Sequence, residues 1–175
     1  MLIALIVAVL VVLALLVASV LARPSPASVD ALLPPELRGA ELVMSERSLE
    51  RTKPVRIRGR PDEVWEKGGR RIIIETKSRA GGVFDGDRMQ LAAYAYLLRG
   101  DGGPPVAPHA YIRFTGADDG LRFQRVKLKD DAAVIAAHRQ FHRVRSGRQR
   151  PGFAEHAALC RGCGHRARCP APRTG

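Results

Sequence analysis

Cysteine is scarce in this chain, and its scarcity excludes one class of protein. Only three of the 175 residues are cysteines, and all three lie between residues 160 and 169. Domains held together by disulfides carry a framework of cysteines in an oxidising compartment. Three thiols so close together indicate instead a metal or cluster site in a reducing compartment.

Charge is absent from the N-terminal segment, since no Asp, Glu, Lys or Arg precedes Arg23. About 20 apolar residues are enough to span a bilayer. We therefore expect residues 1–22 to form a transmembrane anchor, with a cleaved signal peptide as the alternative. Basic residues follow this segment, so the positive-inside rule places the C-terminal domain in the cytoplasm. Four prolines between residues 23 and 35 predict a linker.

Acidic residues are rare near the C-terminus. From residue 134 onward there is one acid, Glu155, against nine arginines, and the whole chain has a formal net charge of +12. Such basic surfaces favour polyanions, nucleic acid first and anionic lipid second. Their contacts follow the phosphate backbone without reading bases. The arginines that we expect to contact nucleic acid are Arg139, Arg143, Arg145, Arg148 and Arg150.

The most informative stretch, residues 59–77, predicts a β-hairpin. Gly68 and Gly69 are typical of a tight two-residue turn, because glycine tolerates the positive φ that such turns need. An isoleucine-rich strand follows the turn. With this turn, Lys67 pairs with Arg70, and the register of the whole hairpin is set.

This register predicts a cation site. Counting outward from the turn places Asp62 directly opposite Glu75. Their Cβ atoms are then roughly 5 Å apart, which suits two carboxylates that bind one hard cation such as Mg²⁺. Lys77 lies on the same strand face as Glu75, within reach of a water molecule and of the phosphate that this water attacks.

Further elements follow along the chain. A helix is expected from about residue 87 to 99, ending at Gly100. Gln90 and Tyr94 are four residues apart on it and share one face. We expect strands at 109–115 and 121–128, and a helix from 130 to about 145. Residues 36–50 predict a helix or a helix followed by a strand, and a first core strand begins near residue 55.

Four motifs occur in order along the sequence. They are Gly59 to Asp62, Glu75-Thr-Lys77, Gln90-Leu-Ala-Ala-Tyr94 and Cys160-x2-Cys163-x5-Cys169. Together they resemble the PD-(D/E)XK nuclease superfamily over about residues 36–170. The resemblance is closest to the branch that contains RecB-type nuclease domains and CRISPR-associated adaptation exonucleases.

The resemblance implies a Mg²⁺ or Mn²⁺ site. Asp62, Glu75 and the backbone carbonyl of Thr76 would hold the metal, and Lys77 would orient the attacking water. The metal would polarise the phosphate and acidify the water.

The same resemblance implies roles for three further residues near the metal site. Gln90 would hydrogen-bond beside the water or Lys77. Tyr94 would contact nucleic acid or brace the site, with plain core packing as the alternative. Glu46 resembles an acidic residue that many relatives add upstream, with a solvated glutamate as the alternative.

The cysteines depart from the family pattern. In the relatives, three late cysteines join one early cysteine to hold a [4Fe–4S] cluster. Here the late set is Cys160, Cys163 and Cys169, and no cysteine precedes it to act as the early ligand. His165 or His156 would be the fourth ligand of a cluster or of a Cys₃His zinc site. The third alternative is a vestigial site with three free thiols.

We therefore expect an α/β protein with a restriction-endonuclease-like mixed sheet flanked by helices, preceded by one transmembrane helix. The expected organisation is an anchor (1–22), a linker (23–35), a nuclease-like domain (36–150) and a cysteine-containing basic tail (151–175). The expected function is metal-dependent hydrolysis of DNA at a membrane. The alternative is a membrane-tethered module that binds nucleic acid without cleaving it.

Overall fold

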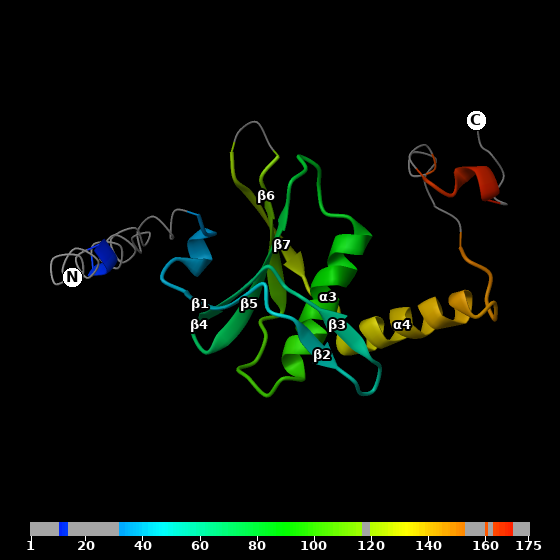
Figure 1. Ribbon diagram of the computed structural model, residues 1–175, viewed down its shortest axis with the longest axis horizontal. Coiled ribbons are helices and arrows are strands. Elements are labelled where there is room, and N and C mark those ends of the chain that lie inside the picture. The colour runs from blue at the N-terminus through cyan, green and yellow to red at the C-terminus, as the bar shows by residue number, and fades with distance from the viewer. Residues whose placement is uncertain (1–10, 14–31, 117–119, 153–159, 161–162, 170–175) are drawn as a thin grey trace, which may run out of the picture. The chain divides into compact units, whose positions relative to one another are not determined.

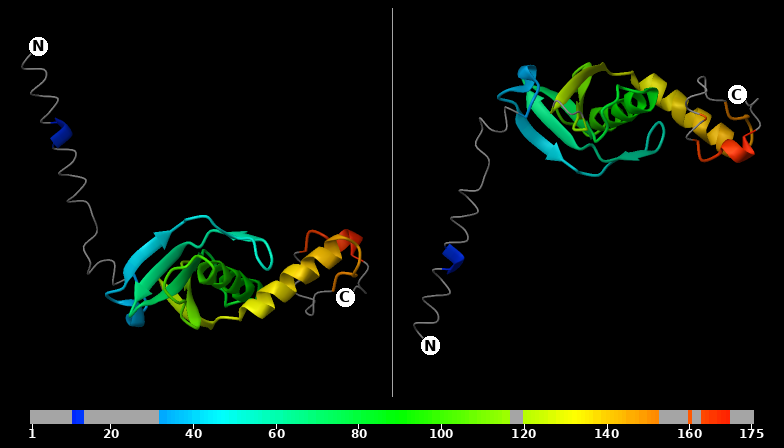
Figure 2. Two further views of the ribbon diagram at one scale, coloured as in Figure 1. Left: turned by 90° about the horizontal axis from the view of Figure 1, so that it is seen from below. Right: turned by 90° about the horizontal axis from the view of Figure 1, so that it is seen from above.

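The structure is a computed structural model that describes residues 11–13, 32–116, 120–152, 160 and 163–169. The chain divides into two compact units, residues 1–131 and 132–175, which are described separately below. Figures 1 and 2 show the elements in three views.

A five-stranded mixed sheet forms the centre of the first unit, in the order β1-β4-β5-β6-β7. Strand β5 pairs in parallel with β6, and the other neighbours are antiparallel. The sheet confirms the expected mixed α/β architecture. Its strands are β1 (Glu41–Ser45), β4 (Glu63–Lys67), β5 (Arg70–Lys77), β6 (His109–Phe114) and β7 (Arg122–Lys127).

The hairpin between β4 and β5 has the register that the sequence predicts. Gly68 and Gly69 have φ values of 58° and 69°, as a turn that matches the twist of its strands requires. Lys67 pairs with Arg70, and the pairing continues without a bulge to Glu63 opposite Ile74. The next position outward is Asp62 opposite Glu75.

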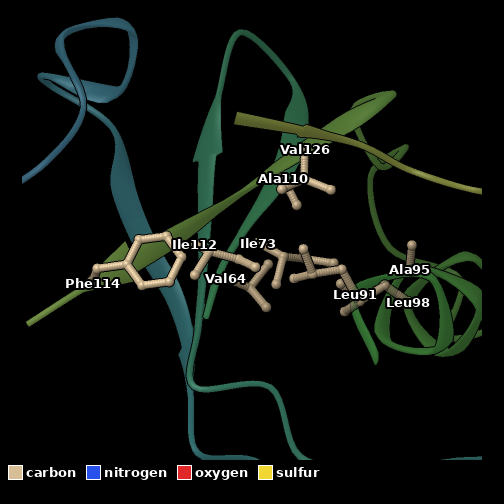
Figure 3. Close-up of a cluster of buried hydrophobic side chains, with 9 residues drawn as sticks. All are labelled: Val64, Ile73, Leu91, Ala95, Leu98, Ala110, Ile112, Phe114 and Val126. Atoms are coloured by element: carbon tan, nitrogen blue, oxygen red, sulfur yellow. The ribbon is translucent and has the colours of Figure 1, made fainter. Parts of the chain in front are cut away.

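Helix α3 (Asp85–Arg99) lies across one face of this sheet (Figure 1). It begins two residues before the predicted start and is followed by Gly100, as expected. Figure 3 shows the core that it forms with alternate residues of the strands. The buried side chains of this cluster are Val64, Ile73, Leu91, Ala95, Leu98, Ala110, Ile112, Phe114 and Val126.

The opposite face of the sheet is covered by the short helix η1 (Pro35–Leu37) and the residues before it. Leu33 and Leu37 are buried there against Trp65 and Ile74, with Ile72, Ala107 and Tyr111 in the same cluster. The central strand β5 is therefore covered on both faces, which explains its uninterrupted run of isoleucines.

A separate two-stranded sheet is made by β2 (Leu49–Arg51) and β3 (Ile57–Gly59). We expected a helix or a helix and strand before residue 50, and the structure has η1, β1 and β2 there. At Gly59 an added Cβ would lie 2.9 Å from Leu97 and 3.0 Å from the ring of Tyr94. The glycine thus allows β3 to approach α3 closely.

Two further helices are α4 (Asp131–Arg145) and η2 (Arg166–Arg168). The start of α4 at Asp131 lies one residue after the expected cap. Asp131 forms ion pairs with Arg51 at 3.1 Å and with Arg99 at 2.6 Å.

The membrane prediction requires correction. No helix among the described residues has the length and apolar composition needed to cross a bilayer. The two long helices, α3 and α4, have 15 residues each and carry charged side chains, whereas a span needs about 20 apolar residues. The prediction of a single-pass membrane protein is therefore wrong for the part of the chain that the structure describes. The prediction of a cytoplasmic C-terminal domain depended on that membrane span and is withdrawn with it. Of the expected anchor, residues 1–10 and 14–22 lie outside the described residues.

Candidate active site

Two carboxylates meet where β5 leaves the core. Glu75 points to the α3 face of the sheet, like Ile73 two residues before it, and is 4% exposed. Asp62 precedes β4, and its Oδ2 accepts a hydrogen bond of 2.8 Å from the backbone N–H of Thr76. This bond attaches the Asp62 carboxylate to the strand that carries Glu75. The hairpin therefore brings together the two predicted metal ligands.

Helix α3 completes a hydrogen-bonded network around Glu75. Gln90 donates through Nε2 to Glu75 Oε1 at 2.6 Å, and Lys77 donates to the same oxygen at 2.9 Å. Lys77 also donates to Gln90 Oε1 at 2.8 Å. Three residues that the sequence singles out thus contact one another in one cluster.

The environment of Glu75 opposes its negative charge. Burial raises the pKa of Glu75, and the nearby charge of Asp62 acts in the same direction, while the hydrogen bonds from Lys77 and Gln90 lower it. The second carboxylate oxygen, Oε2, is buried without a hydrogen-bond partner. A buried carboxylate oxygen with no donor is costly unless a cation or a water molecule occupies that position.

These donors fit a hard divalent cation. Mg²⁺ is typically held by one or two carboxylates and completes its shell with water and substrate phosphates. Asp62 and Glu75 supply two carboxylates, and the unpartnered Oε2 of Glu75 supplies an open donor atom. Among the described residues, no group of three or more His, Cys, Asp or Glu side chains is placed to hold a metal. A cation here would therefore need further ligands besides the two carboxylates, such as the predicted backbone carbonyl of Thr76.

Tyr94 lies one helical turn beyond Gln90 and accepts a hydrogen bond of 2.9 Å from Gln90 Nε2 through its hydroxyl. Burial raises the pKa of Tyr94, so the phenol stays protonated over the neutral range. Its ring packs against the hydrophobic core and against Gly59. Both the bracing and the packing interpretations of Tyr94 therefore have a contact in the structure.

Asp87 is a residue whose part in the site the sequence reasoning missed. It lies in the first turn of α3, where its carboxylate accepts a hydrogen bond of 2.8 Å from the Phe84 N–H. Asp87 is also buried, pairs with Arg79 and lies 4.0 Å from the amino group of Lys77. Its spacing of three residues from Gln90 was the available signal, because such residues share a helix face.

An ion pair between β4 and β6 lies next to Thr76, and the sequence reasoning also missed it. Arg113 of β6 forms a two-pronged ion pair with Glu63, at 2.7 and 2.8 Å. The same guanidinium is 3.4 Å from the hydroxyl of Thr76, the residue that it faces across the parallel ladder. An arginine between apolar neighbours in a buried strand was the signal for such a pair.

Glu46 is near the site through its backbone only. Its N–H donates to the backbone carbonyl of Asp62 at 3.0 Å, and it has a positive φ of 50°. Its exposed carboxylate forms an ion pair with Arg60 at 2.8 Å. The structure therefore does not bring the Glu46 carboxylate to the Asp62–Glu75 pair.

The other predicted residues belong to the second unit. The five arginines expected to contact nucleic acid, which we call the basic tract, are all exposed; they are Arg139, Arg143, Arg145, Arg148 and Arg150. Cys160, Cys163 and Cys169 are free thiols, and the Cys163 N–H donates to the Cys160 carbonyl at 3.3 Å. His165 is the residue before η2. His156 lies outside the described residues.

Comparisons with known proteins give a family and a fold neighbour. Residues 15–170 match the family model described as the PD-(D/E)XK nuclease superfamily. Among solved structures, the chain is similar to one titled "Crystal structure of SSO0001", with a TM-score of 0.49 and 21% identity. The similarity covers 73% of this chain and 60% of that one, so the chain spans less than two thirds of that neighbour. No curated protein matches.

Proposed function

Because the chain belongs to the PD-(D/E)XK nuclease superfamily, we propose that it hydrolyses phosphodiester bonds of DNA with the help of Mg²⁺ or Mn²⁺. The observation that supports this proposal best is the convergence of Asp62, Glu75 and Lys77. One buried oxygen of Glu75 has no partner there, and the amino group of Lys77 is 2.9 Å from the other oxygen.

Asp62 and Glu75 would hold the cation, with the Thr76 carbonyl as a further ligand. When bound, the cation polarises a phosphate and acidifies a water molecule. The chain keeps Glu75 available for this task in two ways. Lys77 and Gln90 offset its burial by hydrogen bonds, and the Thr76 N–H holds Asp62 next to it.

Lys77 is the residue placed to act on the reacting groups. Its ammonium group has three N–H bonds, of which Glu75 and Gln90 accept two. The third is available to a water molecule or a phosphate oxygen, and the side chain is 18% exposed. A fixed positive charge at this point stabilises the charge that develops on the phosphorus oxygens.

Two further parts of the proposal concern the second unit. The exposed arginines of the basic tract would bind the phosphate backbone, which supports DNA binding without base recognition. Cys160, Cys163 and Cys169, with His165, would hold an iron–sulfur cluster or a zinc ion that stabilises the tail. The hydrogen bond from the Cys163 N–H to the Cys160 carbonyl supports this part, because it holds the backbones of two of the cysteines close together.

The test is cleavage of single- and double-stranded DNA with Mg²⁺, Mn²⁺ or EDTA. Wild-type protein should cut only with a metal, and Lys77→Met should lose cleavage while it binds DNA normally. Lys127→Met, an exposed lysine of β7, is the matched control. The products of an end-labelled strand decide between exonuclease and endonuclease action. DNA binding without cleavage under every metal condition would instead support the non-catalytic alternative.

A thermal-shift measurement tests the metal ligands separately. A cation that binds only the folded state stabilises it by about 1.4 kcal/mol at tenfold excess over its dissociation constant. Mg²⁺ should therefore raise the melting temperature of the wild-type protein and leave that of Glu75→Gln unchanged. Equal shifts in both proteins would place the cation elsewhere.

A further inference from the structure

Residues 55–61, which contain β3, carry a regular series of exposed arginines. From residue 55 to 61, inward and outward positions alternate, with Val55 and Pro61 buried at the two ends. The outward positions are Arg56, Arg58 and Arg60, which we call the arginine row. Their side chains are 68%, 74% and 61% exposed. A strand rises about 3.3 Å per residue, so successive members are ~6.6 Å apart, the scale of one nucleotide in an extended strand.

The arginine row ends at the candidate active site. Arg60 precedes Asp62 by two residues and pairs with Glu46, whose N–H donates to the Asp62 carbonyl. The inward side of the strand is also connected to the site. Gly59 lies against the ring of Tyr94, which is hydrogen-bonded to Gln90. Figure 1 shows β3 beside α3, the helix that supplies these two residues.

Two members of the row are held in position by one acid. Glu50 of β2, directly opposite Arg58, contacts Arg56 Nε at 2.6 Å and Arg58 Nε at 3.1 Å. A single carboxylate shared by two guanidinium groups leaves a net positive charge. Each guanidinium has five N–H bonds, so further donors remain for other acceptors. Side chains that are ordered beforehand lose less entropy when a ligand binds.

We propose that the arginine row binds successive phosphates of a DNA strand and leads that strand to the Asp62–Glu75 site. This inference rests on the proposed function and adds the route of the substrate. It differs from the basic tract of the second unit, since the row lies in the unit that contains the site. Arginines that contact phosphates alone bind without regard to sequence.

The test measures binding without cleavage. A labelled single strand of about 20 nucleotides is titrated with the protein in EDTA, at salt concentrations from about 0.05 to about 0.2 M. In the variant Arg56→Gln/Arg58→Gln, two phosphate contacts are lost, which lowers the salt slope of log K by about 1.4 and the affinity roughly tenfold at 0.15 M salt. The charge-conserving variant Arg56→Lys/Arg58→Lys should keep the slope.

Arg70→Gln is the matched control, because Arg70 is an exposed arginine at the turn end of β5. It should bind like the wild-type protein. If the double glutamine variant also binds with the wild-type affinity and slope, the row does not contact DNA and the proposal is refuted. A protein that loses binding through the row but cuts no substrate under any metal condition would refute the proposed nuclease function alone.

Discussion

Replacing Gln90 by methionine tests how the site keeps Glu75 charged. Gln90 donates to Glu75 at 2.6 Å and accepts from Lys77 at 2.8 Å. Methionine has a similar length and adapts well to irregular space, but it offers neither the donor nor the strong acceptor. Gln90→Met therefore removes these two hydrogen bonds and the one to the Tyr94 hydroxyl, and it leaves the packing of α3 almost unchanged.

The size of the effect follows from the charge on Glu75. A hydrogen bond to a charged group contributes about 1.5–3 kcal/mol. At 1.36 kcal/mol for each factor of ten, cleavage should fall by about 10- to 150-fold. The loss also changes the pH dependence. Burial raises the pKa of Glu75 and the Gln90 hydrogen bond lowers it, so the pKa should rise further in the variant.

The assay is the rate of Mg²⁺-dependent cleavage as a function of pH. Protonated Glu75 cannot hold the cation, so activity is lost as the pH falls through its pKa. The acidic limb of the profile should therefore lie at higher pH in Gln90→Met than in the wild-type protein. Gln124→Met, at an exposed position of β7, is the control. An acidic limb that stays in place or moves to lower pH would refute this account of Glu75.

Two further predictions separate folding from chemistry. Arg71 is buried and bonds Asp101 and the carbonyls of Leu98 and Pro104, so Arg71→Met should reduce the free energy of unfolding by about 3–5 kcal/mol in chemical denaturation. The exposed neighbour Arg70→Met should leave it within about 0.5 kcal/mol, and equal losses would contradict the importance of burial. Cys163→Ser should lower the melting temperature and the bound iron or zinc while residual cleavage keeps its pH profile. Wild-type protein without either metal, and with three alkylatable thiols when folded, would rule out the cysteine site.

The local parts of the site were predictable from sequence. Two adjacent glycines set the register of the hairpin, and that register places Asp62 opposite Glu75 by counting alone. The four-residue spacing of Gln90 and Tyr94 likewise places both on one helix face. These features depend on backbone geometry over short distances, which the sequence records directly.

The parts that were missed depend on contacts between distant segments. The pairing of Arg113 with Glu63 joins β6 to β4 across the intervening strand β5. The close approach of β3 to α3 needs the missing side chain of Gly59, and no periodicity in residues 36–60 indicates that contact. The apolar N-terminal segment satisfied a composition rule, but the described helices do not include a membrane span.

The short hydrogen-bonded path around Glu75 also bears on how the protein can be modified. The side chains bonded around Glu75, from Asp62 to Tyr94, belong to one continuous hairpin-and-helix segment. The flanking elements add Arg113 of β6, which pairs with Glu63, and the Glu46 N–H, which donates to the Asp62 carbonyl. The network around Glu75 is thus written in one stretch of sequence, and the strands β1 and β6 hold that stretch in place by pairing with β4 and β5. New chain ends between β6 and β7 would leave that stretch of sequence unbroken, but they would lie next to Lys77, because the Thr115 N–H donates to the Lys77 carbonyl at 3.0 Å. An insertion there would therefore report on the site through the position of Lys77.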